Sequence, residues 1–190
     1  MENKVILNST ELTGIMNRDE MNKLSLVIEE KKWKEYRKRY DEAANLKILD
    51  FPIQIDFELN SSCNLKCPMC PISAESPKGK GKSTWFDFEL YKKIIDYSYL
   101  QGTRAIKLNY VNEPLIRKDI IQFIKYAKKV GILDIYLSTN GMLLNEKMSD
   151  ELIDSGLTRI QISIDAVSED TYQKVRPGGK LKTVISNLNN

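Results

Sequence analysis

The chain has 190 residues, of which 42% are hydrophobic and 29% charged, as in an ordinary globular domain with one sizeable core. Its 29 basic and 26 acidic residues leave a formal charge of +3, too small to indicate binding to nucleic acid or to an anionic membrane. No apolar run reaches membrane-span length, and the first residues lack the charged-then-apolar order of a signal peptide. We therefore expect a cytoplasmic protein without a membrane span or a nucleic-acid partner, in a compartment where thiols stay reduced.

Residues 1–50 are predicted to form a charged, helical N-terminal extension. The segment EEKKWKEYRKRYDEA places Trp33, Tyr36 and Tyr40 at near-helical spacing. This stripe fits either a basic, aromatic helix that binds nucleic acid or a solvated helix that packs its aromatic side chains on the following domain. Acidic residues interleave the basic ones throughout the segment, which favours the packing interpretation.

Residues 51–190 are predicted to form one α/β domain, because short apolar strands alternate with amphipathic helices. Asp87 and Asn145 are the expected N-caps of two of the helices, and Gly131 and Gly156 are expected helix ends. The alternation predicts parallel βαβ units joined by right-handed crossovers. The expected strands cover 51–59, 104–111, 133–138 and 158–164, and the expected helices cover 87–98, 117–130, 145–156, a short stretch from 168, and 181–190.

Polar side chains share one face of several expected strands, which favours an incomplete barrel over an open sheet. Parallel strands that are covered on both faces are almost continuously apolar, so a polar face indicates strands that point into a cavity. An error in the assumed phase of the strands would produce the same pattern. The residues concerned are Gln54, Asp56 and Glu58 on the first strand, Lys107 and Asn109 on the second, and Gln161 and Ser163 on the fourth.

All three cysteines of the chain, Cys63, Cys67 and Cys70, lie in the stretch CNLKCPMC, and the chain has no histidine. A structural zinc site takes four ligands, so zinc would need a carboxylate or an outside ligand here. A disulfide would leave one thiol over, and a catalytic cysteine would lack a histidine base. An iron–sulfur cluster with four irons would be anchored by three thiolates and keep one iron open to a small chelating molecule.

The spacing in CNLKCPMC, directly after a strand, resembles the signature of the radical S-adenosylmethionine (SAM) enzymes. YVNEPLI after the second strand resembles the family's Gly-Gly-Glu segment, and LSTNGMLL resembles its Thr-Asn-Gly turn. QISIDAVSEDTYQKVRPGG resembles the Ser-x-Asp segment and Arg-Gly-Gly ending of members with SPASM or Twitch extensions. The resemblance runs from about residue 52 to residue 190, and each motif follows an expected strand, where ligands bind in βα folds.

The resemblance implies a 4Fe–4S cluster and SAM as cofactors. Cys63, Cys67 and Cys70 would ligate the cluster, and Met69 would pack near the adenine of SAM. Glu113, helped by the backbone near Asn112, would accept from the SAM ammonium group. Four further residues are expected near the SAM carboxylate or ribose: Ser163 and Asp165, with Ser138 and Asn140 as weaker candidates, the last also explained as a turn residue.

The implied fold is a partial (βα) barrel of the radical SAM type, with about four of the six units of the complete barrel in residues 51–190. We expect the chain to be truncated before the last strands and any auxiliary-cluster domain. The implied activity is reductive cleavage of SAM, followed by hydrogen abstraction from a small-molecule, sugar or peptide substrate. The implied electron donor is a low-potential protein such as flavodoxin or ferredoxin.

Two alternatives, one departure from the family's motif and one further motif remain at this stage. The chain could be a degenerate relative that binds a cluster without turnover, or a structural metal-binding interaction module that holds zinc. Asn112 stands where the family commonly has glycine, so the backbone there approaches SAM differently. The stretch PKGKGKSTW ends like a phosphate-binding loop, but it lacks the first glycine and a preceding strand, which favours a lysine-rich surface loop.

Overall fold

The computed structural model describes residues 29–75 and 84–189, with 1–28, 76–83 and 190 outside the described part. Most of the lysine-rich stretch PKGKGKSTW therefore lies outside the described residues. Helices of the described ranges are all too short or too polar to cross a membrane.

The described residues form one parallel sheet of four strands in the order β1-β2-β3-β4. The register aligns Asp56, Lys107 and Tyr136 across the first three strands, and Tyr136 is next to Arg159 on the fourth. Consecutive parallel neighbours confirm the predicted α/β architecture, because each strand reaches the next through a helical crossover. The strands are β1 (Gln54–Asp56), β2 (Ala105–Lys107), β3 (Asp134–Thr139) and β4 (Arg159–Ile162).

The expected helices are present, and their ends follow from capping residues. Asp87 and Asn145 accept from the backbone N–H three residues ahead, while Gly131 and Gly156 adopt the left-handed conformation that ends a helix. Two short elements without a periodic pattern, α3 and η2, were not expected. The helices are α2 (Glu30–Ala44), α3 (Pro71–Glu75), α4 (Phe88–Gln101), η2 (Pro114–Ile116), α5 (Ile120–Val130), α6 (Glu146–Ser155), α7 (Glu169–Val175) and α8 (Leu181–Leu188).

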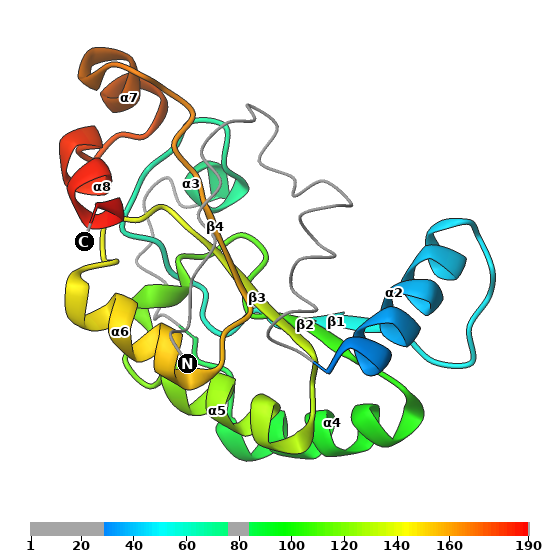
Figure 1. The fold of residues 1–190 in the computed structure, drawn as a ribbon. Helices are drawn as coiled ribbons and strands as arrows, with labels where there is room; N and C mark the ends of the chain where they lie inside the picture. The colour runs from blue at the N-terminus through cyan, green and yellow to red at the C-terminus, as the bar shows by residue number, and fades with distance from the viewer. Residues whose placement is uncertain (1–28, 76–83, 190) are drawn as a thin grey trace.

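The two faces of the sheet differ in polarity. Helices α4, α5 and α6 run along one face (Figure 1), where Ile106 and Leu137 are fully buried against Phe123 of α5. On the opposite face the Gln54 side-chain amide donates to Asp56 and to the hydroxyl of Tyr136. This arrangement confirms the predicted strand phase and leaves a polar face turned away from the helices.

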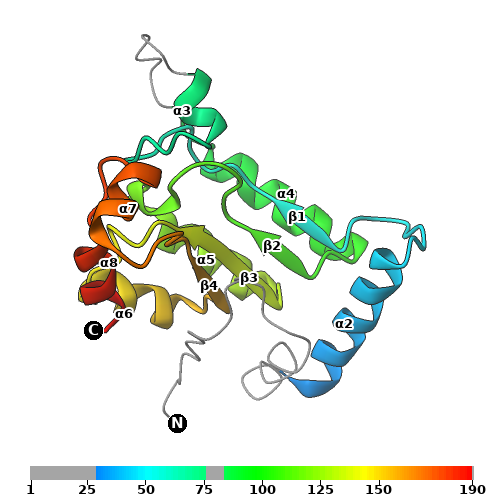
Figure 2. The same cartoon turned by 90° about the horizontal axis from the view of Figure 1, so that it is seen from above.

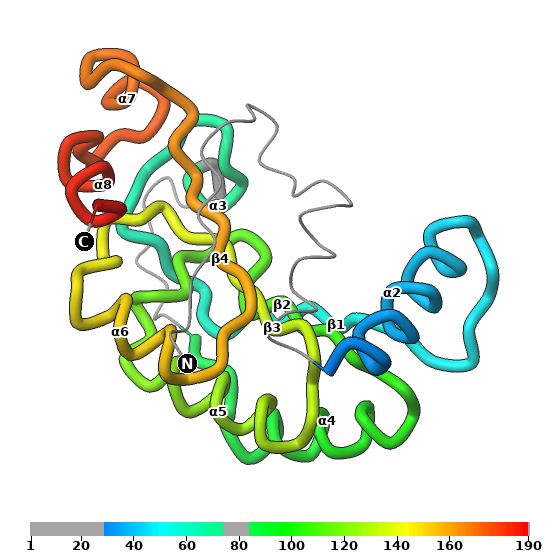
Figure 3. The backbone as a smooth tube through the Cα atoms, viewed as in Figure 1, coloured from blue at the N-terminus to red at the C-terminus, as the bar shows by residue number. Residues whose placement is uncertain are grey.

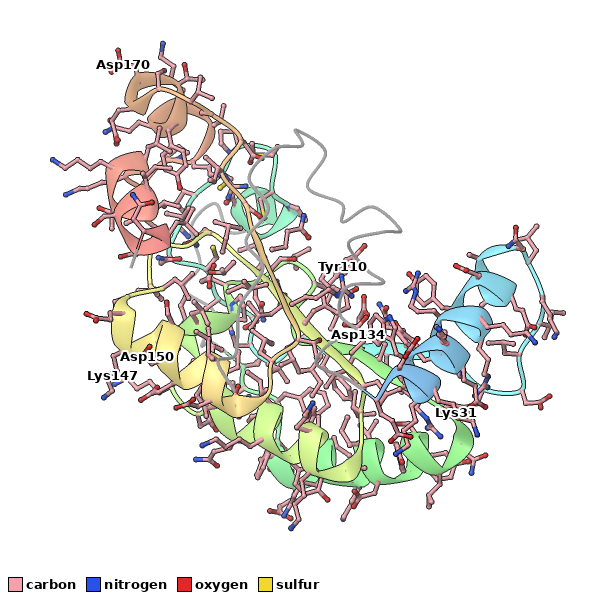
Figure 4. The ribbon with its side chains drawn as sticks, in the orientation of Figure 1. Lys31, Tyr110, Asp134, Lys147, Asp150 and Asp170 are labelled. Carbon is pink, nitrogen blue, oxygen red and sulfur yellow. The ribbon has the colours of Figure 1, made fainter. Side chains whose placement is uncertain are left out.

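Helix α2 packs at the opposite end of the molecule from α7 and α8 (Figures 1 and 2). Trp33 and Tyr36 are each 1% exposed and pack with Ile53 and Ala105, which lie before β1 and at the start of β2. The Tyr36 hydroxyl donates to Asp134 at 2.9 Å, on the side of the sheet that faces α2 (Figure 4). The packing interpretation of the aromatic stripe is therefore confirmed.

The Tyr36–Asp134 hydrogen bond provides a test of this docking. Replacing Tyr36 by Phe should lower the free energy of unfolding by about 1–3 kcal/mol, because a buried carboxylate loses a donor. The matched control is Tyr40→Phe, the same change on the same helix at a partly buried ring, which should cost less than about 0.5 kcal/mol. Urea unfolding followed by circular dichroism measures both, and equal effects would contradict the docking role.

Candidate functional site

The loop that carries the cysteines follows β1 and is fixed at its start by Asn60, which is 2% exposed. The Asn60 amide donates to the backbone carbonyl of Glu113, and its side-chain oxygen accepts from the backbone N–H of Ser62. The backbone N–H of Glu113 in turn donates to the carbonyl of Ser62 at 2.9 Å. The start of the cysteine loop is therefore bonded to the loop that follows β2.

The three thiols lie on one loop and are all free, with Cys67 buried and Cys63 and Cys70 partly exposed. The N–H of Leu65 points to the Cys63 sulfur at 3.4 Å, and the N–H of Cys70 closes a turn onto the carbonyl of Cys67 at 3.0 Å. A backbone N–H directed at sulfur stabilises the thiolate form. The loop conformation thus suits sulfur ligands.

The described residues include no site that holds one metal ion. Within residues 29–75 and 84–189, no three cysteine, aspartate or glutamate side chains are arranged to hold a single metal ion. A mononuclear zinc site needs its ligands around one centre, whereas a cluster takes each thiolate at a different iron.

Burial raises the pKa of two of the three thiols, those of Cys63 and Cys67. Burial raises the pKa of Cys63, with a smaller contribution from the Glu113 carboxylate and an opposing one from the N–H of Leu65. Burial also raises the pKa of Cys67, while the guanidinium of Arg176 opposes the rise. Because a thiol must lose its proton to bind a metal, metal binding at these residues would release protons.

Glu58 organises the loop after β2, a role that the sequence did not indicate. Its carboxylate accepts from three consecutive backbone N–H groups, those of Tyr110, Val111 and Asn112, at 3.1, 2.9 and 3.2 Å. These partners are more than fifty residues away in the chain. The only sequence signal was the position of Glu58 in the polar register of the first strand.

Asn112 presents a buried acceptor that has no partner. The residue is 7% exposed, and its side-chain N–H group donates to the carbonyl of Asn60 at 2.6 Å. This bond fixes the amide plane and directs the side-chain oxygen the other way, where no described group donates to it. An unpaired buried acceptor is costly, so this oxygen suits a ligand that carries N–H donors.

Glu113 is 1% exposed and already has a structural role. Its carboxylate accepts from Thr139 Oγ1 at 2.7 Å and from the backbone N–H groups of Asn140 and Leu115 at 2.8 and 3.1 Å. Burial raises the pKa of Glu113, and these three hydrogen bonds oppose the rise. A carboxylate offers about four acceptor positions, so about one remains for a ligand.

The turn after β3 brings Asn140 to the cysteine loop. Its amide nitrogen donates to Asn64 Oδ1 at 2.7 Å and lies 4.0 Å from the Cys63 sulfur, while its oxygen accepts from the N–H of Met142. Gly141 has a φ of +75°, and a Cβ there would be 2.9 Å from a Val184 methyl group. Asn140 is thus both a turn residue and a neighbour of the thiols.

The other predicted residues are less enclosed. Ser138 lies on the polar face, where its hydroxyl pairs with Gln161 at 3.3 Å. The N–H of Ser163 extends the pairing of β4 to Thr139. Asp165 is exposed and has a φ of +60°, and Met69 is 61% exposed. The structure therefore groups Cys63, Glu113 and Asn140 closely and leaves Met69 and Asp165 near the surface.

Arg117 is a second residue that the sequence did not single out. Its guanidinium is buried, donates to the carbonyls of Leu59 and Phe86, and pairs with Asp119 at 2.8 Å. It also lies over the ring of Phe123, 4.1 Å from the centroid. Arg117 thus fastens the start of the cysteine loop to α4 and α5.

Comparison with known proteins assigns this geometry to a family. Residues 57–190 match the family described as the Radical SAM superfamily. A probable GTP 3′,8-cyclase of Methanococcus maripaludis strain S2 is 37% identical over 127 residues, covering 66% of this chain and 41% of the relative. The GTP 3′,8-cyclase of Alkaliphilus metalliredigens is 36% identical over 130 residues, covering 66% and 39%. The chain spans about two-fifths of the length of these curated relatives.

Solved structures share the fold. BtrN in complex with AdoMet and 2-DOIA aligns with a TM-score of 0.53 at 24% identity, over 67% of this chain and 52% of BtrN. Streptococcus suis SuiB bound to S-adenosylmethionine aligns with a TM-score of 0.60 at 17% identity, over 83% and 35%. These likenesses confirm the predicted partial barrel of the radical SAM type.

The structural role of Glu113 can be tested in the metal-free chain. Replacing Glu113 by Gln puts an N–H group against one of its three donors and should lower the free energy of unfolding by about 1–3 kcal/mol. Glu89→Gln is the control, because its exposed carboxylate pairs with Lys92 on the surface of α4, and it should cost less than about 1 kcal/mol. Urea denaturation measures both, and an unchanged stability of Glu113→Gln would mean that the carboxylate serves the ligand alone.

Proposed function

The chain belongs to the radical SAM superfamily, and from this membership we propose that the protein is an enzyme that cleaves SAM reductively at a cluster held by Cys63, Cys67 and Cys70. The cofactors of the family are a 4Fe–4S cluster and SAM. The observation that carries the proposal is the set of three free thiols on one loop, bonded through Asn60 and Asn140 to the loops after β2 and β3.

The residues present fit a cluster with one open iron. Three thiols in the described loop supply three ligands, and the given sequence contains no further cysteine and no histidine. The N–H of Leu65 at the Cys63 sulfur favours the charged ligand. These observations support a cluster that keeps a coordination position for SAM.

The ammonium group of SAM would bind beside the loop after β2. The unpaired side-chain oxygen of Asn112 and the remaining acceptor position of Glu113 match two of the three donors of an ammonium group. Glu58 holds this loop in place through three backbone N–H groups. In family members with glycine before the glutamate, the backbone supplies an acceptor for the ammonium group. In this chain the side-chain oxygen of Asn112 would supply it.

The remaining parts of SAM would lie along the ends of β3 and β4. Ser163 and Asp165 would contact the carboxylate or the ribose, with Ser138 and Asn140 nearby, and the exposed side chain of Met69 would cover the adenine. These assignments rest on the resemblance of the motifs and on their common position after the strands.

A 4Fe–4S cluster held by the three cysteines would, when reduced, supply the single electron that reductive cleavage of SAM requires and so allow hydrogen abstraction from a substrate. The protein contributes position and enclosure. Helices α4, α5 and α6 close one face of the sheet, while the polar face, with Gln54, Lys107 and Ser138, stays available to substrate. Because the relatives are named GTP 3′,8-cyclases, GTP is the first substrate to assay, followed by sugars and peptides.

The proposal includes its partners. A low-potential donor such as flavodoxin or ferredoxin would reduce the cluster, and a reducing cytoplasm would keep the thiols available. The assignment to the SPASM or Twitch subgroup stays a prediction, and so does the division at residue 50. A relative that binds the cluster without turnover is the competing hypothesis for the chain, and the test below separates the two.

Anaerobic reconstitution tests the cluster. The protein should take up about four iron and four sulfide ions per chain, and Cys67→Ser, which keeps a similar shape without a thiolate, should lose most of them. Addition of SAM and dithionite should then give 5′-deoxyadenosine, measured by liquid chromatography and mass spectrometry. Stoichiometric zinc without iron would support the zinc module instead, and a cluster without 5′-deoxyadenosine would support the relative without turnover.

The ammonium contact of Asn112 can be tested separately. Asn112→Ala should weaken SAM binding about tenfold or more, because a hydrogen bond to a charged group contributes about 1.5–3 kcal/mol. The change is followed in the electron paramagnetic resonance spectrum of the reduced cluster during SAM titration. Asn145→Ala, which removes only the N-cap of α6, should leave SAM affinity unchanged, and equal affinities of both variants would exclude the contact.

A further inference from the structure

Two buried polar side chains at the end of the molecule that carries the cysteines have atoms without a partner. Tyr172 on α7 is fully buried, and its hydroxyl makes no hydrogen bond within the described part of the chain. The side chain of Arg176, one turn later, is 13% exposed, and its Nε–H is buried and likewise unpaired. Unpaired buried donors cost free energy, so two neighbouring ones indicate an acceptor that the described residues do not supply.

This pair lies against the cysteine loop. The N–H of Lys66 donates to the carbonyl of Pro177 at 3.0 Å, and Gly178 packs on Leu65. Figure 3 shows the segment around α7 beside the loop that leads to α3. Gly179 is so close to the Tyr172 ring that a Cβ there would lie 2.7 Å from a ring carbon. The segment that carries both unpaired donors is therefore fastened to the loop of the three thiols.

The guanidinium is oriented by Asp165. Its Nη2 forms an ion pair with the Asp165 carboxylate, which projects from a residue in the left-handed conformation. That ion pair involves Nη2, and Nε–H has no hydrogen-bond partner among the described residues. Cys67 directly follows Lys66, whose N–H is bonded to the carbonyl of Pro177, the residue after Arg176.

We propose that the Tyr172 hydroxyl and the Arg176 Nε–H donate to the cluster–thiolate group at Cys67 and raise its reduction potential. The inference rests on the proposed function, since it requires the cluster at the three cysteines. A 4Fe–4S core with three thiolates becomes more negative when it accepts an electron. Hydrogen-bond donors and a positive charge beside it therefore stabilise the reduced form more than the oxidised form. Both residues are positioning and tuning residues, because they act on the cluster through its ligand sphere.

The test compares Tyr172→Phe with Tyr91→Phe in the anaerobically reconstituted protein. The two changes are chemically the same, and both rings are fully buried. Tyr91, however, donates to the carbonyl of Phe123 at 3.0 Å in the helical layer, away from the cysteine loop. The reduction potential is measured without SAM by a redox titration followed by electron paramagnetic resonance. We expect a shift to more negative potential for Tyr172→Phe and no shift for Tyr91→Phe.

Thermal melting adds a readout that does not depend on electron transfer. Tyr172→Phe should leave the Tm of the metal-free protein unchanged or raise it, because the lost hydroxyl has no partner there, and should lower the Tm of the cluster-loaded protein. Tyr91→Phe should lower both by the same amount. Arg176→Lys keeps the charge that pairs with Asp165 but removes Nε–H, and it should also shift the reduction potential to more negative values. This variant provides the test if Tyr172→Phe does not fold.

The outcomes separate the two proposals. If the wild-type protein binds no iron and sulfide, the proposed function fails and this inference fails with it. If all variants bind the cluster and Tyr172→Phe and Arg176→Lys keep the wild-type potential, only this inference is overturned. A shift that occurs in the presence of SAM alone would also overturn it, because the acceptor would then be the carboxylate of SAM.

Discussion

The buried carboxylate of Glu113 is the constraint on which the site depends. A charge that is removed from water must be satisfied by protein donors, and here these come from the turn after β3 and from the residue two positions ahead. The backbone of Glu113 also bonds Ser62 and Asn60 at the start of the cysteine loop. One residue therefore joins the loops after three strands, and the loops are fixed relative to one another before any cofactor is present.

Other charged groups extend this arrangement. Glu58 holds the loop after β2 by three backbone N–H groups, and Arg117 holds the start of the cysteine loop by two backbone carbonyls. In both cases a charged side chain bonds main-chain groups, which fixes loop conformation without regard to the neighbouring side chains. Such preorganisation limits the free energy that a ligand must spend on ordering the site. The loops are therefore held by main-chain bonds, and within them the side-chain oxygen of Asn112 remains an unpaired acceptor among the described residues.

The contacts between α2 and the core lie at one end of the strands, and the residues of the proposed site lie at the other end. At the N-terminal ends of the strands, α2 covers the core with Trp33 and Tyr36 and bonds Asp134. At the C-terminal ends lie the thiols, Glu113 and the segment around Arg176. In parallel βα folds the loops at the C-terminal ends vary without disturbing the core, so this polarity allows the site to be elaborated while α2 and the helical layer maintain the fold.

The sequence by itself determined the parallel βα order, the helix caps and the cysteine loop, because these follow from local periodicity, capping chemistry and short spacing. The sequence also indicated Glu113, through a motif that follows a strand. It did not predict that the Glu113 carboxylate is buried and accepts three hydrogen bonds. Glu58, Arg117 and Tyr172 were missed for one physical reason. Glu58 and Arg117 bond backbone groups that are far away in the sequence. The Tyr172 hydroxyl has no hydrogen-bond partner among the described residues. Only the tertiary structure brings the loops together at one end of the sheet. In that arrangement the Glu113 carboxylate holds neighbouring loops together, and the buried Tyr172 hydroxyl is left without a partner among the described residues.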